Sequence, residues 1–297
     1  MCLENSLENK IPIVVLNYND YDTAKVFLER YKTDLTGVAE LVFVDNHSDD
    51  GSFESLKEEY GQLGIFLRSE KNRGYGSGNN IGLKYIRKYM NAKKVIISNP
   101  DIVVKPEVIV TLSNLLDAHK EVKIIAPKML DTEGREQTSA WKTQGVFRDA
   151  MSSLILINRI LKLDKKVYSS EELREKSLYV DAVNGSFFMA DMEAFEEMGF
   201  FDEDTFLYCE ENILAYKLKK AGYKEMLVNN ISYIHAHNAT IGKVFKGKAK
   251  RYKLLQQSRK IYYKKYLKCG AVKRIFFDVI SAIGLLERNV LELFLRK

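Results

Sequence analysis

Five short apolar runs, rich in β-branched residues, alternate with segments of helical spacing through the first 130 residues. The runs are IPIVVLN (11–17), ELVFVDN (40–46), GIFLRS (64–69), KKVIISN (93–99) and VKIIAPKM (122–129). Strands that alternate with helices indicate βαβ units, and uniformly apolar strands fit a sheet that is covered on both faces. We therefore expect an α/β fold with a mostly parallel central sheet flanked by helices.

Beyond residue 130 the alternation gives way to an irregular stretch, 131–180, with one predicted helix near 147–162. The run DAVNGSFFMA (181–190) predicts a strand interrupted by Gly185, and a short helix (191–198) follows it. A further helix closes at Gly222, because glycine is favoured just after a helix, and strands are expected near 225–234. From residue 243 onward the spacing of apolar residues predicts two or three helices, of which the last is amphipathic.

Three of the predicted strands end in polar residues. Asn17 and Tyr18 end the first strand, Asp45 ends the second, and Asn99 and Asp101 follow the fourth. In open α/β sheets, ligands bind beyond the carboxyl ends of the strands. Each Asp or Asn alone could simply cap the next helix. Three such ends together favour a ligand site in one crevice.

A glycine-rich segment, NRGYGSGNNIG (72–82), follows the third predicted strand and opens a helix, as a phosphate-binding turn does. It lacks the Lys-Ser/Thr pair of a nucleoside-triphosphate loop, and a dinucleotide fingerprint normally follows the first strand. An oxidoreductase with a dinucleotide cofactor is therefore the weaker hypothesis. The asparagines of the segment suit sugar hydroxyls or phosphate oxygens.

Three further segments supply ionisable groups. Asp101, in SNPDIVV, is a lone carboxylate that could hold Mg²⁺ or Mn²⁺ against a substrate diphosphate. Glu210 and Glu211 open a predicted helix, where either the helix dipole accounts for both or one of them is a general base. Adjacent helical residues point about 100° apart, so at most one of the two serves as base. His235 and His237 could complete a metal site, although a histidine is more often structural.

Charge is distributed unevenly along the chain. Residues 243–297 hold 16 Lys and Arg against 3 Asp and Glu, a net charge of +13, whereas residues 1–242 carry a net charge of −7. The segment 271–297 combines an apolar face with cations at both ends, which suits binding at a membrane surface. Packing on the catalytic domain or in a homodimer interface is the alternative. Nucleic acid is not expected, because the basic residues accompany long apolar stretches.

Cysteine content and hydropathy indicate the compartment. The cysteines Cys2, Cys209 and Cys269 are widely separated, which argues against a disulfide framework or a thiolate zinc site and for a reducing environment. No run of about 18 uncharged apolar residues occurs, so we expect no membrane span. We therefore expect a cytoplasmic protein that binds peripherally at the inner face of the plasma membrane.

The order of these motifs resembles that of a known family. VVLNYN, VDNHSDDGS, NRGYGSGNNIG, SNPDIVV, NGSFFM and GFFDEDTFLYCEENILAYKLKKAGY, with a trailing histidine, follow one another between residues 11 and 242. This order is similar to that of the inverting family-two glycosyltransferases with the GT-A fold, especially their bacterial rhamnosyltransferase-type branch. The resemblance implies a catalytic domain over 1–242, with a donor half (about 11–130) and an acceptor half (about 131–242), and a basic amphipathic helical region over 243–297.

The resemblance assigns the donor side residue by residue. Tyr18 and Asp45, with Asn17 beside them, match positions that contact the nucleotide base and ribose. The segment that lines the sugar-nucleotide pocket is matched by Asn72, Gly74 and Asn79. Asn99 and Asp101 occupy the Asp-x-Asp-like motif of the family, with Asp101 on the metal and diphosphate.

On the acceptor side, the resemblance gives Glu211 the position of the catalytic base, with Glu210 as the other candidate. His235, or else His237, matches the histidine that closes the metal site, and we place Trp141, Gly185 and Ser186 against the acceptor. Three positions depart from the family pattern. Asn99 stands where many relatives carry a carboxylate, Glu211 is one methylene longer than the usual Asp, and Ile213 replaces a second Asp.

The resemblance implies a metal-dependent inverting transferase that moves a sugar from a nucleoside-diphosphate donor to a hydroxyl of a lipid-linked glycan in cell-surface polysaccharide synthesis. The first expectation for the donor is dTDP-rhamnose, and a UDP-sugar carrying galactofuranose, glucose or galactose is the alternative. A non-catalytic carbohydrate-binding or scaffold protein is the alternative outside the enzyme class.

Overall fold

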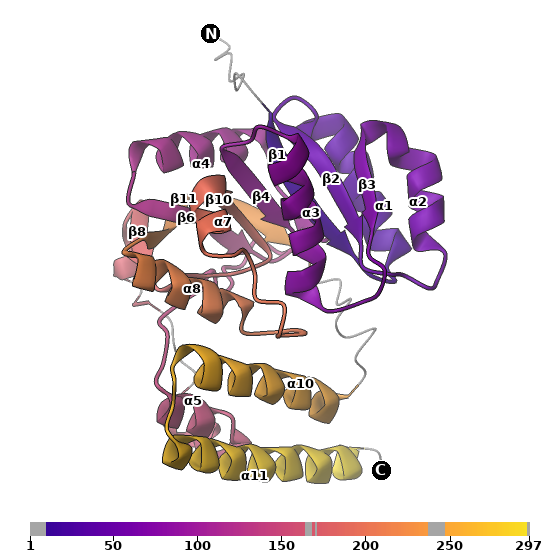
Figure 1. Ribbon diagram of the computed structural model, residues 1–297. Coiled ribbons are helices and arrows are strands. Elements are labelled where there is room, and N and C mark those ends of the chain that lie inside the picture. The colour runs from indigo at the N-terminus through magenta and orange to yellow at the C-terminus, as the bar shows by residue number, and fades with distance from the viewer. Residues whose placement is uncertain (1–9, 164–167, 170, 237–246, 296–297) are drawn as a thin grey trace.

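The computed structural model describes residues 10–163, 168–169, 171–236 and 247–295 (Figure 1). It confirms the first five predicted strands to within one residue at either end. They are β1 (Ile11–Asn17), β2 (Ala39–Asp45), β3 (Gly64–Arg68), β4 (Lys94–Ser98) and β6 (Val122–Leu130). The helices between them are α1 (Tyr21–Arg30), α2 (Ser52–Tyr60), α3 (Tyr75–Tyr89) and α4 (Pro106–Ala118).

Within the described residues, nine strands form one mixed sheet in the order β3-β2-β1-β4-β10-β6-β11-β5, with β8 (Ser177–Val180) beside β11. Strands β3, β2, β1 and β4 are parallel to one another. Strand β10 (Phe187–Asp191) runs antiparallel between β4 and β6, and β11 (Lys224–His235) runs parallel to β6. The two-residue strand β5 (Ile102–Val103) closes one edge, antiparallel to β11. The expected mostly parallel central sheet is confirmed.

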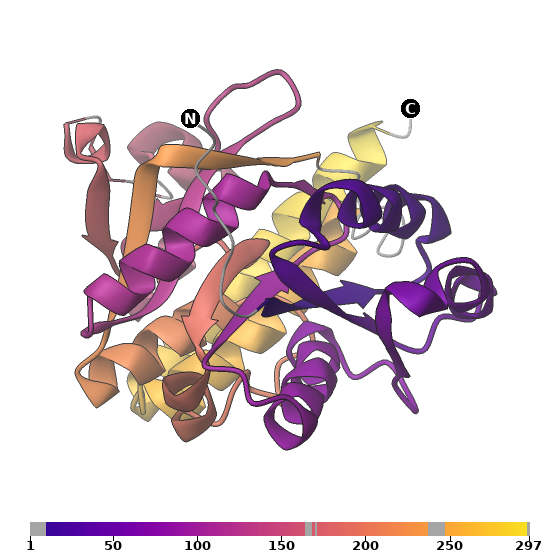
Figure 2. The ribbon, with the colours of Figure 1, turned by 90° about the horizontal axis from the view of Figure 1, so that it is seen from above.

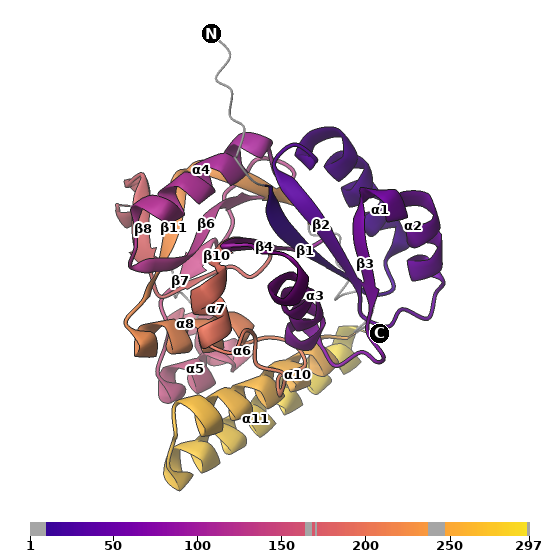
Figure 3. The ribbon, with the colours of Figure 1, turned by 45° about the horizontal axis from the view of Figure 1, so that its top comes forward.

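Helices cover both faces of the sheet (Figures 2 and 3). Side chains alternate between the faces of a strand, and β1 shows this directly. Ile13 and Val15 pack in a buried cluster with α1, α2 and α4. Val14, between them, packs with α3, α7 (Met192–Glu197) and α8 (Glu210–Ala221) on the other face. The unbroken apolar character of β1 follows from burial on both sides.

Two predictions for the middle of the chain are wrong in detail. The helix predicted over 147–162 is two short helices, α5 (Val146–Ser152) and α6 (Ile155–Leu161). Between them, the Ser153 hydroxyl donates to the Ala150 carbonyl at 2.6 Å, which competes with continued helix, and Leu154 is extended. The strand predicted over 181–190 is also two strands. Of these, β9 (Ala182–Val183) pairs with β7 (Ala140–Trp141) in a separate small sheet, and only β10 enters the main sheet.

The C-terminal region is helical, as predicted, and its helices form a hairpin. It consists of α10 (Lys248–Ile261), a π-helical turn (Tyr262–Tyr266) and α11 (Ala271–Leu295). The hairpin lies at the end of the molecule toward which β1 to β3 run, and Figure 2 shows it crossing beneath the sheet. Of the helices that the structure describes, none is both long enough and apolar enough to cross a bilayer.

Buried polar contacts attach this hairpin to the rest of the chain. Arg259 donates to the Asp149 carboxylate of α5 at 2.9 Å, and the Tyr263 hydroxyl donates to the same carboxylate. The Ser258 hydroxyl donates to the Leu207 carbonyl at 2.7 Å. Lys265 lies 2.7 Å from Asp202. The hairpin is therefore packed against the loop that precedes α8.

We expect the Asp149→Ala substitution to destabilise the protein, because it leaves the buried Arg259 guanidinium without this carboxylate. Breaking a buried ion pair from one side typically costs about 3–5 kcal/mol. Urea unfolding measures the loss. Asp278→Ala is the matched control, since it breaks an exposed pair with Lys260 and should cost about 0–1 kcal/mol. Equal losses in the free energy of unfolding of the two variants would show that the Asp149 contact does not hold the hairpin in place.

Candidate active site

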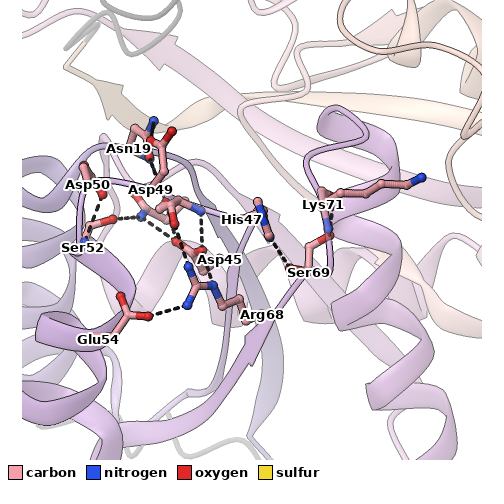
Figure 4. Close-up of polar contacts among 12 residues, drawn as sticks. Asn19, Asp45, His47, Asp49, Asp50, Ser52, Glu54, Arg68, Ser69 and Lys71 are labelled. Atoms are coloured by element: carbon pink, nitrogen blue, oxygen red, sulfur yellow. Dashed lines mark hydrogen bonds and ion pairs between the residues drawn. The ribbon is translucent and has the colours of Figure 1, made fainter.

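The carboxyl ends of β1 and β2 are joined by a polar cluster around Asp45 (Figure 4). The Asp45 carboxylate is completely buried and accepts hydrogen bonds from the Ser48 amide at 2.8 Å and the Ser48 hydroxyl at 2.6 Å. The Asn17 amide nitrogen lies 3.3 Å from it, and Arg68 approaches at 3.8 Å. These contacts give Asn17 and Asp45 a structural role at the carboxyl ends of β1 and β2. Tyr18, beside them, is partly exposed.

The glycine-rich segment packs against the loop before α8. Gly74 has a φ of +101°, and a Cβ at this position would lie 2.0 Å from the Phe206 carbonyl oxygen, so a side chain is excluded. The Tyr75 amide donates to the same carbonyl at 2.9 Å. Asn72 accepts from the Gly74 amide at 2.9 Å, and Asn79 is fully buried with its amide on the Tyr75 carbonyl. The segment is therefore packed directly on the loop before α8.

The 184–186 segment, just before β10, brings further candidate residues together. The Gly185 carbonyl accepts from the Tyr75 hydroxyl at 2.8 Å, and the Gly185 amide donates to the Glu211 carboxylate at 3.3 Å. A Cβ on Gly185 would lie 2.8 Å from that same carboxylate oxygen. The approach of Glu211 to the backbone thus requires glycine at position 185.

Ser186 extends this network toward the metal candidates. Its carbonyl accepts from the Asn99 amide at 2.8 Å, at the end of β4. Its hydroxyl lies 2.8 Å from the hydroxyl of Tyr233 on β11. Two residues further along β11 is His235. The 184–186 segment therefore contacts α3, α8, β4 and β11 at one place.

Asp101 and His235 face one another at the junction of β5 and β11. The Asp101 Oδ1 and His235 Nε2 atoms are 3.2 Å apart, and both side chains are nearly buried. The Ala236 amide donates to the Asp101 carbonyl at 2.9 Å, which fixes the pair in the sheet. Within the described ranges, no group of three or more His, Cys, Asp and Glu could hold a metal ion. His237, the other predicted ligand, lies outside the described residues.

Glu210 and Glu211 begin α8, as predicted, but their environments differ. Glu210 is 5% exposed, whereas Glu211 is partly exposed beside the 184–186 segment. Burial, and then the neighbouring Glu211 carboxylate, raise the pKa of Glu210 to about 8. Burial also raises the pKa of Glu211 above its ordinary value. A carboxyl with a raised pKa in a cleft is a suitable proton acceptor near neutral pH.

The backbone just before these two glutamates is strained. Tyr208 and Cys209 have φ values of 74° and 69°, a region that non-glycine residues rarely adopt. Consecutive left-handed residues persist only where the surroundings hold them, which occurs most often at functional sites. Here the surrounding contact is the hydrogen bond from Ser258 of the C-terminal hairpin to Leu207.

Trp141 is the last of the candidate residues near the start of α8. Its indole nitrogen donates to the Asn212 side chain at 2.8 Å, which places β7 against the first turn of α8. The three predicted acceptor residues, Trp141, Gly185 and Ser186, therefore lie around that turn. Tyr75 and Asn212 lie within motifs that the sequence singled out, but nothing in the sequence pointed to Tyr233, whose partner Ser186 is 47 residues away.

Comparison with known proteins identifies relatives of the chain. The family model described as Glycosyl transferase family 2 matches residues 13–199. Agl10 of Haloferax volcanii, a low-salt glycan biosynthesis hexosyltransferase, is 27% identical over 222 residues, or 73% of this chain and 64% of Agl10. The chain thus spans less than two thirds of that protein. Rhamnosyltransferase WbbL of Escherichia coli is 25% identical over 290 residues, or 91% of this chain and 98% of WbbL.

The name of a third relative includes its acceptor. The N-acetylglucosaminyl-diphospho-decaprenol L-rhamnosyltransferase of Mycobacterium tuberculosis is 23% identical over 232 residues, or 76% of this chain and 75% of that protein.

Two solved structures share the fold. GalNAc-T7 with UDP, GalNAc and Mn²⁺ superposes with a TM-score of 0.58 at 18% identity, covering 78% of this chain and 45% of that one. The mannosyltransferase PcManGT of Pyrobaculum calidifontis, with GDP-Man and Mn²⁺, gives 0.55 at 15% identity, covering 96% of this chain and 74% of that one. At such identities the likeness concerns the fold alone. It confirms the expected GT-A type of α/β architecture.

We expect Glu210→Gln to stabilise the protein increasingly as the pH rises. A carboxyl whose folded-state pKa is raised binds its proton more tightly in the native state. Its contribution to stability is therefore present at low pH and is lost as the pH rises from the ordinary glutamate value toward about 8. Glutamine has no such dependence. Thermal unfolding of both proteins from about pH 5 to about pH 9 measures the change in the difference of their Tm values. A difference in Tm that stays constant across this pH range would contradict the raised pKa of Glu210.

Proposed function

The chain belongs to glycosyl transferase family 2, as the order of its motifs predicts, and we propose that it transfers a sugar from a nucleoside-diphosphate donor to an acceptor hydroxyl with inversion. The observation that carries this proposal is the position of Glu211. Its partly exposed carboxylate contacts Gly185 at 3.3 Å, in the segment that also contacts the end of β4 through Asn99. A proton acceptor thus adjoins the strand end where the donor diphosphate is expected.

The preferred donor is dTDP-rhamnose. WbbL and the decaprenol-linked enzyme are both named as rhamnosyltransferases, and WbbL matches this chain over nearly its whole length. A hexosyl donor carried on UDP is the second candidate, favoured by the name of Agl10 and by the UDP complex of GalNAc-T7.

Glu211 is the better of the two candidates for the base. Glu210 is buried and its neighbours are protein atoms, so an acceptor hydroxyl has little access to it. Glu211 is partly exposed, and one of its carboxylate oxygens accepts from the Gly185 amide. A general base must lie within hydrogen-bond reach of the proton that it removes.

Asp101 and His235 are the residues that would hold a divalent metal. An oxygen and a nitrogen atom 3.2 Å apart at a strand end are an incomplete ligand set, which fits Mg²⁺ or Mn²⁺ bound through one carboxylate and substrate phosphates. Both of the solved structures compared above are complexes with Mn²⁺. When bound, the cation would stabilise negative charge on the leaving diphosphate.

The residues of the chain then account for a single displacement. Glu211 accepts the proton of the acceptor hydroxyl, whose oxygen forms a bond to the anomeric carbon from the face opposite the diphosphate. The bond from that carbon to the diphosphate oxygen breaks in the same step, and the diphosphate oxygen keeps the electron pair. Because attack and departure are on opposite faces, the configuration inverts. Tyr75 and Gly185, through their 2.8 Å hydrogen bond, hold the two halves of the site in register.

We further propose a lipid-linked glycan as acceptor and a peripheral position on a membrane. The decaprenol-linked acceptor in the name of one relative supports the first part. The second is supported by α11, which leaves large apolar side chains exposed along its length, among them Val272, Ile275 and Leu286. The alternative, a non-catalytic carbohydrate-binding or scaffold protein, has the same fold but requires no base at position 211.

We expect Glu211→Gln to lower kcat by about 10²–10⁴-fold, the usual contribution of a general base, while donor binding is retained. Glu210→Gln is the matched control and should keep most of the transfer activity. Transfer is measured with radiolabelled dTDP-rhamnose and UDP-sugars, and donor binding by calorimetry. Undiminished transfer by Glu211→Gln would contradict the assignment of the base, and transfer by neither the variants nor the wild type would favour the scaffold alternative.

Asp101→Asn should instead weaken donor binding, because it removes the carboxylate proposed to join metal and diphosphate. Calorimetric titration with each donor, in the presence and absence of Mn²⁺, compares this variant with the wild type. The wild type should bind one donor more tightly with Mn²⁺, and the variant should lose most of that difference. An equal response to Mn²⁺ in both proteins would exclude Asp101 as a ligand.

A further inference from the structure

Helix α11 has two apolar faces, and only one of them is covered. Its inner face packs against α10 and α5 through residues such as Phe277, which is 1% exposed. The opposite face carries a row of apolar side chains that are between 41% and 78% exposed. We call it the apolar face; its members are Val272, Ile275, Val279, Ile283, Leu286, Val290 and Leu293. A row this long on one helix marks an interaction surface rather than scattered surface residues.

Helix α6 adjoins α11. The Ile155 amide, at the start of α6, donates to the Glu287 carboxylate of α11 at 2.8 Å. Leu156, Ile160 and Leu161 of α6 are each more than 60% exposed. Figure 3 shows α6 beside the C-terminal hairpin, at the same end of the molecule. Two separate parts of the chain therefore present exposed apolar residues at this end.

A cavity of about 400 Å³ opens at the first turn of α11, and its lining is basic. Lys260, Lys264, Lys273 and Arg274 line it, with Asp278 as the acidic member. Lys260 is neutralised by Asp278 at 2.8 Å. By contrast, the side chains of Lys264 and Arg274 have no ion pair or hydrogen bond within the part of the chain that the structure describes. We call this the basic cavity.

The basic cavity and the apolar face are continuous. Ile275 belongs to both, since it lines the cavity and is 63% exposed on the outer side of α11. Phe147, which is 49% exposed, lies near the cavity with Lys273 over its ring at 6.0 Å. An anion held in the basic cavity would therefore lie at the edge of an apolar surface. The phosphate of a membrane lipid likewise lies at the boundary of the apolar acyl chains.

We propose that the basic cavity binds the headgroup phosphate of an anionic lipid while the apolar face and α6 lie in the outer part of the bilayer. This inference rests on the peripheral membrane position proposed above and names the lipid chemistry that it requires. Charge complementarity favours a lipid over a second copy of the chain, because two copies would bring like-charged cavities together. Interfacial helices bind by apolar burial together with attraction to anionic headgroups.

This contact would also orient the candidate active site. Ser258 and Lys265, in the same hairpin, hold Leu207 and Asp202 of the loop that leads into Glu210 and Glu211. The hairpin lies at the end of the molecule toward which β1 to β3 run (Figure 1). A bilayer on the outer side of α11 would thus lie at the end of the molecule where the crevice opens.

Sedimentation with lipid vesicles tests the proposal, using full-length wild type and variants. Vesicles are either phosphatidylcholine alone or phosphatidylcholine mixed with phosphatidylglycerol. We expect the wild type to prefer the mixed vesicles. The double variant Lys264→Gln/Arg274→Gln should lose roughly 30-fold in binding to them, since each basic residue at a membrane surface contributes about 1 kcal/mol.

The control is Lys248→Gln/Lys253→Gln, which removes two exposed cations near the opposite end of α10. It should lose at most a few-fold, although the net charge changes equally. Equal losses in the two double variants would overturn the cavity as a lipid site but leave the membrane contact intact. Equal binding of the wild type to phosphatidylcholine vesicles and to mixed vesicles would overturn an anionic lipid as the ligand of the cavity.

Leu286→Glu separates this proposal from the one on which it rests. The substitution places a charge on the apolar face, far from the basic cavity, and should weaken binding to both vesicle types. A wild type that binds neither type would overturn the peripheral position together with the cavity. If Leu286→Glu weakens binding while the cavity variant matches its control, only the cavity assignment fails.

Discussion

The hydrogen bonds of the 184–186 segment are the contacts on which the site depends. Gly185 joins Tyr75 of α3 to Glu211 of α8, and Ser186 joins the end of β4 to Tyr233. The segment can reach all of these because β10, which follows it, runs antiparallel between β4 and β6. Because β10 is antiparallel to both β4 and β6, its first residues lie toward the carboxyl ends of these two strands. The segment that contacts Glu211 thus also contacts Asn99 and Tyr233, each two residues from a member of the Asp101–His235 pair.

The C-terminal hairpin extends the same network. The loop before α8 is packed from one side by the glycine-rich segment, through the Phe206 carbonyl, and from the other by Ser258 and Lys265. Directly after these contacts come Tyr208 and Cys209 in left-handed conformations. Strain of this kind is maintained only when neighbouring contacts outweigh it. The hairpin is therefore part of what positions the two glutamates, besides presenting an apolar surface.

Much of the fold could be predicted from local patterns. Strands β1 to β4 were found because each is an apolar run followed by helical spacing, and the polar residues at their ends converge as parallel topology requires. The short strands β5, β7 and β8 carry no such pattern, because two to four residues are too few to show one. The Asp101–His235 contact was anticipated only by resemblance, and Ser186–Tyr233 not at all, since both join residues far apart in sequence. The break at Ser153 depends on a side-chain hydrogen bond that apolar spacing does not reveal.

The central claim is a single displacement in which Glu211 activates the acceptor hydroxyl. The stereochemistry of the product tests it most directly. NMR of the glycoside formed from a donor of known anomeric configuration gives the answer, through the one-bond coupling between the anomeric carbon and its hydrogen. The account predicts a product with the opposite configuration at the anomeric carbon, because one displacement inverts it. A product that retains the configuration of the donor would contradict the account, since it would require a second displacement or attack from the same face.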